Sequence, residues 1–302
     1  MKEPQVFEAH ERHVTDLTFT AAGDLLISAG MDNLVRLWSV PDWSLSGTFE
    51  GHTHSVNSLS LSPDGRTLAT GSTDTTVRLW AFPGGEPLYT LQDRRKVVSA
   101  VQISADGRWV AAGSYGGRAK VWTLAGEDVV GIKAGKKNLA SIALSPDGST
   151  LATAGLGDEI SLWALPSGGL VGALSGHEIA VLSLAFVDGG ERLVSLGYEK
   201  TVRAWATGTW EERIVLPLNG PTVRGMAMAP SEDTVAVAAE GEVQLWSLAS
   251  GELRERVAIG VKGVGGMAFS SDGKRLAVGG ADGRIRVFGL EAALGTVGRA
   301  DA

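Results

Sequence analysis

The five histidines are the side chains best suited to chemistry near neutral pH, because imidazole can transfer protons and bind metal ions. They are His10, His13, His52, His54 and His177. The pairs His10–His13 and His52–His54 have spacings that could hold a metal ion, but zinc sites in proteins use three or four ligands. The chain has no cysteine to complete such a site. We therefore expect no metal site and no cofactor.

Histidine also recurs with a hydroxyl residue and an acidic residue at fixed spacing. His10, Ser28 and Asp32 have the residue types of a nucleophilic triad. The same spacing returns at His52, Thr70 and Asp74, and again at His177, Ser195 and Glu199. A combination present in three copies is typical of a structural framework rather than of an active site. The chain also has no GxSxG, HExxH or phosphate-loop motif, so we expect no catalysis.

A tryptophan marks a repeat that must position these residues. Fixed-period self-similarity indicates a repeat architecture. The marks fall every 41 or 42 residues, at Trp38, Trp80, Trp122, Trp163, Trp205, Trp246 and, with phenylalanine in the same context, Phe288. Seven marks at this interval predict seven copies of one structural unit.

A reverse turn forms a second mark, about 16 residues before each of these aromatic residues. It reads SPDG at 62–65, SADG at 104–107, SPDG at 145–148 and SSDG at 270–273, with degenerate forms in the other units. Proline and glycine favour the turn, and aspartate bonds its backbone. One carboxylate per turn is too few for calcium, so we expect these aspartates to be structural.

Each unit contains four short strands and no helical period. In the second unit the expected strands are Val56–Leu61, Leu68–Gly71, Val77–Trp80 and Leu88–Leu91. Four antiparallel strands in roughly 42 residues match one blade of a β-propeller. A lone sheet of this kind exposes two apolar faces, which seven sheets around an axis would cover. The sequence therefore predicts an all-β, seven-bladed β-propeller with four antiparallel strands per blade.

Ring closure is visible at the two ends of the chain. Residues 5–10 (QVFEAH) match residues 47–52 (GTFEGH), which form a fourth strand leading into the next unit. The last unit, residues 263–290, supplies only three strands. We expect Val6–Ala9 to complete the last blade, so that residues 1–290 form one propeller. Residues 291–302 are expected to form a short, loosely ordered tail.

Charge and hydropathy exclude some classes of binding partner. The 302 residues include 27 basic and 34 acidic side chains, for a net charge of −7, with no basic tract. We therefore expect no nucleic-acid binding. The N-terminus has no apolar signal region, and no stretch approaches ~20 consecutive apolar residues, the length of a membrane span. We expect a cytoplasmic protein without membrane association.

With these repeats, residues 5–290 resemble the WD-repeat (WD40) family. The resemblance implies a buried hydrogen-bonded tetrad in a blade: a histidine, a serine or threonine, an acidic residue and the tryptophan. The matching positions are His10, Ser28, Asp32 and Trp38; His52, Thr70, Asp74 and Trp80; and His177, Ser195, Glu199 and Trp205.

Four blades depart from this tetrad pattern. Blade three has Arg94, Ala112 and Gly116, and blade four has Gly135, Thr153 and Gly157 at the first three positions. Blade six is one residue shorter and has no histidine, and blade seven keeps Asp282 but ends in Phe288. The fold prediction does not depend on these residues, because packing and turns carry it.

The resemblance also implies a binding face on one side of the ring, lined by three positions per blade. The positions with side chains able to anchor a protein or peptide are Met31, Tyr115, Leu156, Leu182, Tyr198 and Arg224. Tyrosine and arginine are enriched at binding hot spots. By analogy with the family we expect a non-catalytic scaffold for protein or peptide partners. The alternative is a propeller enzyme, hydrolase-like or lactonase-like, with inward carboxylates or histidines from several blades in a central channel.

Overall fold

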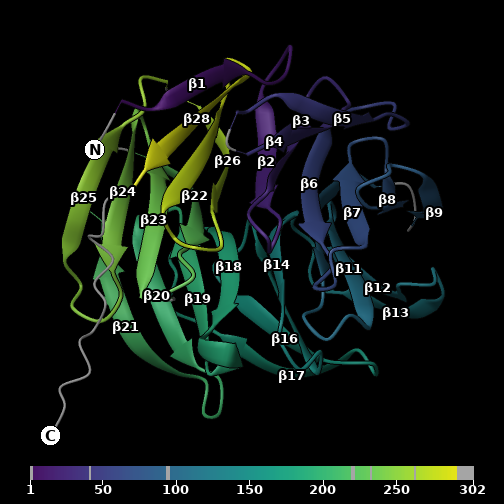
Figure 1. The fold of residues 1–302 in the computed structure, drawn as a ribbon. Coiled ribbons are helices and arrows are strands. Elements are labelled where there is room, and N and C mark those ends of the chain that lie inside the picture. Colours follow the sequence, from purple (N-terminus) through teal and green to yellow (C-terminus); the bar gives the residue numbers. More distant parts are fainter. Residues whose placement is uncertain are drawn as a thin grey trace, which may run out of the picture.

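Seven four-stranded antiparallel sheets stand around a common axis (Figure 1). The computed structural model describes residues 3–40, 42–92, 96–218, 222–231, 233–261 and 263–290. Within these residues the only helical element is a single 3₁₀ turn, Asp188–Gly190. The predicted all-β, seven-bladed propeller is thereby confirmed.

The first strand of each sheet lies toward the axis (Figure 1). These inner strands are β2 (Val14–Phe19), β6 (Val56–Leu61), β10 (Val98–Ile103), β14 (Leu139–Leu144), β18 (Val181–Val187), β22 (Val223–Met228) and β26 (Val264–Phe269). The second strands are β3 (Leu25–Gly30), β7 (Thr67–Ser72), β11 (Trp109–Ser114), β15 (Thr150–Gly155), β19 (Arg192–Gly197), β23 (Thr234–Ala239) and β27 (Arg275–Gly280).

The third and fourth strands complete each blade outward. The third strands are β4 (Val35–Ser39), β8 (Thr76–Ala81), β12 (Arg118–Thr123), β16 (Ile160–Ala164), β20 (Thr201–Ala206), β24 (Glu242–Ser247) and β28 (Arg284–Gly289). The outer strands are β5 (Leu45–Phe49), β9 (Pro87–Gln92), β13 (Asp128–Lys133), β17 (Gly169–Leu174), β21 (Glu211–Pro217), β25 (Leu253–Ala258) and β1 (Gln5–Glu8). The strands predicted for the second unit correspond to β6–β9.

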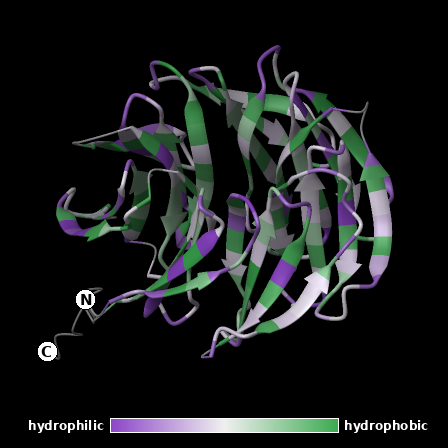
Figure 2. Ribbon diagram, turned by 90° about the horizontal axis from the view of Figure 1, so that it is seen from above, coloured by the Kyte–Doolittle hydropathy of each residue, from purple (hydrophilic) through white to green (hydrophobic). Residues whose placement is uncertain are grey.

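The core is divided among the interfaces between neighbouring blades. Hydropathy alternates along the strands (Figure 2), because successive side chains of a strand point to opposite faces. Between blades one and two, Leu37 and Phe49 pack against Leu59 and Trp80. The seven aromatic marks of the repeat are all buried. Each sheet therefore covers an apolar face of its neighbour, which is the physical reason for the ring.

The N-terminal strand joins the last blade. β1 pairs antiparallel with β28, with Phe7 opposite Ile285, and Phe7 also contacts the rings of Trp38 and Trp43. The strand runs over Gln5–Glu8, one residue earlier than the predicted Val6–Ala9. It ends there because the Ala9 N–H leaves the ladder and donates to the Gly283 carbonyl, at 2.9 Å. The tail predicted at 291–302 lies outside the described residues.

The predicted turns hold themselves closed by side-chain bonds. The Ser62 hydroxyl donates to Asp64 Oδ1 at 2.6 Å, and the Arg66 N–H donates to the same oxygen at 3.0 Å. Gly65 follows with a φ of 67°, a conformation that glycine adopts without steric cost. Across the described part of the chain, no helix is long and apolar enough to cross a bilayer.

Candidate functional site

The structure joins the four residues of each predicted tetrad by hydrogen bonds. In blade two, the Trp80 indole N–H donates to Thr70 Oγ1 at 2.8 Å. Thr70 Oγ1 lies 2.8 Å from His52 Nε2, and His52 Nδ1 lies 2.7 Å from Asp74 Oδ2. All four groups lie where strands β7 and β8 meet the loop that enters the blade.

These distances fix the direction of each hydrogen bond. A carboxylate only accepts, so His52 Nδ1 carries the proton and Nε2 accepts from the Thr70 hydroxyl. Burial lowers the pKa of His52 and keeps the imidazole neutral. Burial favours the neutral acid at Asp74, but hydrogen bonds from Thr76 and His52 outweigh it and lower its pKa to about 2. The chain of donors ends on a charged carboxylate near the surface of the blade.

Blades one and five contain the same chain with different acidic ends. His10 Nε2 lies 2.8 Å from Ser28 Oγ, and Asp32 binds both His10 and Arg36. In blade five Glu199 replaces aspartate and bonds His177, but its Oε2 atom is buried without a partner. Glu199 Oε1 accepts from both His177 and Thr201, whereas Asp74 divides the equivalent bonds between its two carboxylate oxygens.

The remaining blades replace the tetrad in different ways. In blade six the histidine position is residue 219, which lies outside the described residues, and in blade seven it is Gly260. The residues just before these positions, Leu218 and Ile259, are buried among apolar side chains. In blade six the Trp246 indole N–H donates to Gln244 Oε1 at 3.0 Å. In blade four the Trp163 indole N–H donates to Thr153 Oγ1 at 2.9 Å, although Gly135 occupies the histidine position. Arg94 of blade three lies outside the described residues.

Four of the six predicted anchor residues occupy the same turn in different blades. Met31, Tyr115, Leu156 and Tyr198 follow the second strand and are 40–52% exposed. Each backbone N–H donates to a carbonyl just before the inner strand of its own blade. The acceptors are His13, Val97, Asn138 and Ala180, at 2.7–3.0 Å. The repeated bond places these four side chains on one ring face.

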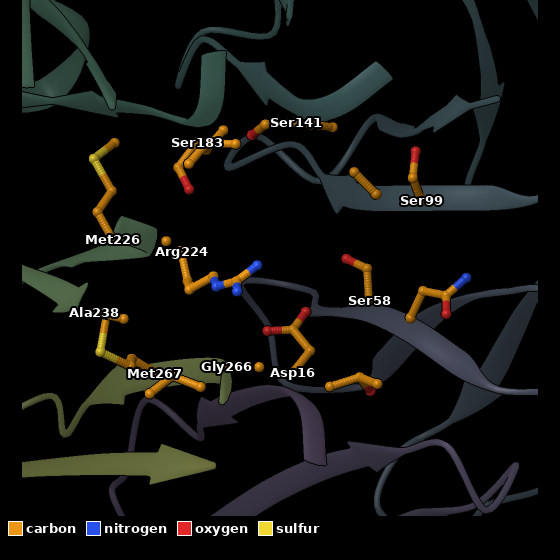
Figure 3. A pocket seen from close by; sticks show the side chains of 18 of the residues that line it. Asp16, Ser58, Ser99, Ser141, Ser183, Arg224, Met226, Ala238, Gly266 and Met267 are labelled. Carbon is orange, nitrogen blue, oxygen red and sulfur yellow. The ribbon is translucent and has the colours of Figure 1, made fainter. Parts of the chain in front are cut away.

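The other two anchor residues line the central channel. A cavity of about 390 Å³ runs between the inner strands, and Leu182 and Arg224 lie in its wall. The side chains of Arg224 and Asp16 both point into this cavity (Figure 3). Among the described residues no carboxylate lies within ion-pair distance of Arg224, and its side chain is exposed. The channel therefore offers an available guanidinium at its mouth.

One residue position of the inner strands forms the inside of this channel. It is occupied in order by Asp16, Ser58, Ala100, Ser141, Ser183, Gly225 and Gly266. Asp16 Oδ2 accepts the Leu59 N–H at 2.9 Å, and Ser58 and Ser141 accept the N–H groups of Val101 and Leu184 in the same way. These three bonds link the inner strands of blades one, two and four to the blade that follows each of them.

Asp16 is the functional candidate that the sequence reasoning missed. It is half-buried in the channel wall, and burial raises its pKa to about 6 despite hydrogen bonds from the N–H groups of Leu59 and Leu17. Aligning the seven inner strands would have revealed it, because it is the only charged residue at its position. A metal centre in the channel would need carboxylates or histidines from several blades. Within the described residues, no cluster of three or more histidine, cysteine, aspartate or glutamate side chains occurs.

Comparison with known proteins agrees with this geometry. The family model described as WD domain, G-beta repeat matches residues 1–39, 43–81, 85–123, 168–206 and 259–289, together more than half of the chain. Comparison with curated proteins gave no match. The unmatched stretches contain most of blades four and six, which both lack the tetrad histidine. On the repeat matches and the seven-bladed ring, the chain belongs to the WD-repeat family.

Proposed function

We propose that the protein is a non-catalytic scaffold that binds a protein or peptide through the ring face bearing Tyr115 and Tyr198. Propellers of WD repeats are generally protein-interaction scaffolds. The observation that supports this face is the group of exposed side chains at equivalent turns, Met31, Tyr115, Leu156 and Tyr198. Large side chains of this kind, held on rigid elements, are typical anchors of protein interfaces.

The channel mouth adds polar recognition to this face. Arg224 is available to an acidic group of the partner, and Leu182 lies beside it in the channel wall. Arginine binds carboxylates with two parallel hydrogen bonds, which fixes orientation as well as charge. A partner that crosses the face would therefore place an acidic side chain at the channel and apolar side chains on the surrounding turns.

Capture of partners from a lysate of the source cells tests this proposal. The variant Tyr115→Ala/Tyr198→Ala is expected to lose most of the captured protein. Tyr89→Ala is the matched control, because Tyr89 is similarly exposed but lies on the outer strand β9. Equal capture by the double variant and the wild type would reject the face, and loss with Tyr89→Ala would place the site on the rim.

A further inference from the structure

Blade four contains a pocket at the place where three other blades hold an imidazole. The pocket has a volume of about 270 Å³. Its lining includes Gly135, Thr153, Gly157 and Ser161, the positions that in blade two carry His52, Thr70, Asp74 and Arg78. The backbone frame of the tetrad is thus retained in blade four, whereas its histidine, acid and arginine side chains are replaced by small residues.

The two glycines leave this space open. A Cβ atom added at Gly135 or at Gly157 would meet no heavy atom within 4 Å. In blades six and seven the position of Thr153 is taken by Val237 and Val278. These valines share apolar clusters with Leu218 and Ile259, the residues just before the histidine position. Those two blades therefore have an apolar side chain where blade four has a hydroxyl. Blade four has Thr153 at the position whose hydroxyl bonds the histidine in blades one, two and five.

Thr153 gives the pocket a buried hydrogen-bond donor. Its side chain is 2% exposed, and its oxygen already accepts the indole N–H of Trp163 at 2.9 Å. In blade two the corresponding hydroxyl proton goes to the bare nitrogen of His52, at 2.8 Å. Among the described residues, the Thr153 hydroxyl donates no hydrogen bond to another protein group. A ligand nitrogen that accepts this proton would form the hydrogen bond that His52 forms in blade two.

The pocket opens toward the ring face. Leu156, a predicted anchor residue of the face, lines it together with Asn138, whose carbonyl accepts the Leu156 N–H. Asn138 Oδ1 accepts the Gly116 N–H at 2.9 Å, which ties the rim to the turn that carries Tyr115. The charged residues Lys136, Lys137, Asp158 and Glu159 also line the pocket. A peptide lying across Tyr115 and Leu156 would therefore pass over the opening.

We propose that the blade-four pocket binds the neutral imidazole of a histidine supplied by a partner peptide. The bare ring nitrogen accepts from the Thr153 hydroxyl, as the chain's own histidines do from Ser28, Thr70 and Ser195. The ring N–H then faces the polar rim. The proposed binding of imidazole is argued from this geometry alone, whereas the origin of the histidine in a partner rests on the proposed function.

The test uses histidine capped as its N-acetyl, N-methylamide derivative, titrated into the full chain at pH 8. The imidazole is neutral there, because its ordinary pKa is ≈ 6.5. The indole N–H resonance of Trp163, assigned with Trp163→Phe, is the readout, since that group shares the Thr153 oxygen. We expect a saturable shift of this resonance with capped histidine, and none with capped phenylalanine. The absence of a saturable shift, or an equal shift with both probes, would overturn the proposal.

Two variants examine the pocket itself. Gly135→His/Gly157→Asp places an imidazole in the pocket from within, and Thr153→Val removes the donor with little change in shape. Each is expected to weaken binding of capped histidine at least tenfold. If both variants bind the probe like the wild type, the site is elsewhere. Thr153→Val keeps the test valid if the double variant does not fold.

Two further measurements separate this proposal from the function of the face. Tyr115→Ala/Tyr198→Ala should bind capped histidine as the wild type does, even where it no longer captures a partner. Saturating capped histidine should reduce partner capture by the wild type and leave capture by Gly135→His/Gly157→Asp unchanged. If the probe binds but capture is unaffected, the partner does not supply the histidine.

Discussion

Blades two and four share a backbone frame and differ in what completes it. In blade two, Trp80, Thr70, His52 and Asp74 form an unbroken series of hydrogen bonds from the core to the rim. In blade four the series stops at Thr153, and a pocket lies beyond it. The comparison shows that packing and turns suffice to build a blade, whereas the tetrad is an added network that one blade replaces in part with an open pocket.

Removing the acidic end of the network should give the largest difference in stability between equivalent substitutions in blades two and four. Asp74→Ala leaves the buried His52 N–H without its charged acceptor, and losing such a hydrogen bond costs up to about 3 kcal/mol. The equivalent substitution in blade four, Gly157→Ala, adds a Cβ atom that meets no neighbour, so its effect should be within about 0.5 kcal/mol. Urea denaturation measures both values. Equal losses would mean that the network of blade two contributes nothing of its own.

Removing the shared hydroxyl should give a smaller difference in stability loss between the two blades. Thr70→Val takes away both the acceptor of Trp80 and the donor to His52. Thr153→Val takes away only the acceptor of Trp163. At ~1 kcal/mol for each hydrogen bond, we expect losses of about 2 and about 1 kcal/mol in the free energy of unfolding. A larger loss from Thr153→Val would show that blade four relies on this threonine more than blade two does.

Rebuilding the hydrogen-bond network of blade two in blade four should stabilise the protein. Gly135→His/Gly157→Asp supplies the missing imidazole and carboxylate to Thr153 and Trp163. We expect a gain of about 1 kcal/mol, from new hydrogen bonds and from the lower chain entropy of the unfolded state. Calorimetry would show a higher melting temperature than that of the wild type. Gly135→Ala/Gly157→Ala is the control, since it shares the entropy term and lacks the hydrogen bonds.

The pH dependence of that gain provides the finest comparison. The pKa of Asp74 is lowered to about 2, and burial lowers the pKa of His52. Both groups therefore contribute stability at neutral pH. The histidine contribution declines as pH falls below about 6.5, and the aspartate contribution declines between about 4 and about 2. The rebuilt blade should lose its advantage over the wild type in the same two ranges, measured as the difference in melting temperature. A constant difference from pH 7 to pH 3 would mean that the new side chains do not pair.

The fold was predictable because its determinants are local and repeated. The tryptophan period, the turn motifs and the match of residues 5–10 to residues 47–52 each indicate a blade or its closure. The three tetrads could be located by position, since all twelve residues have the expected types or, at Glu199, a close substitute. Hydrogen bonds now join the members of each set.

The rest of the site could not be predicted from residue types alone. Gln244 lies two residues from Trp246 on the same strand, a side-chain pairing that no repeat motif encodes. The pocket of blade four depends on two glycines, whose meaning appears only when the space around them is known. Arg224 was recognised as an anchor, but its place in the channel depends on how seven inner strands meet. Asp16 went unnoticed because its neighbours in the ring lie about 42 residues away in sequence.

The pairing of β1 with β28 sets how the ring responds to mechanical load. Gln5 lies opposite Val287 and Glu8 opposite Arg284, so the chain enters and leaves the sheet at the same end of this ladder. A force that pulls the two ends apart therefore loads the hydrogen bonds one pair at a time, as in the peeling of a hairpin, rather than all together. The pairing of β1 with β28 should therefore separate at a small force. A force applied to both termini would open the ring at this pair of strands first.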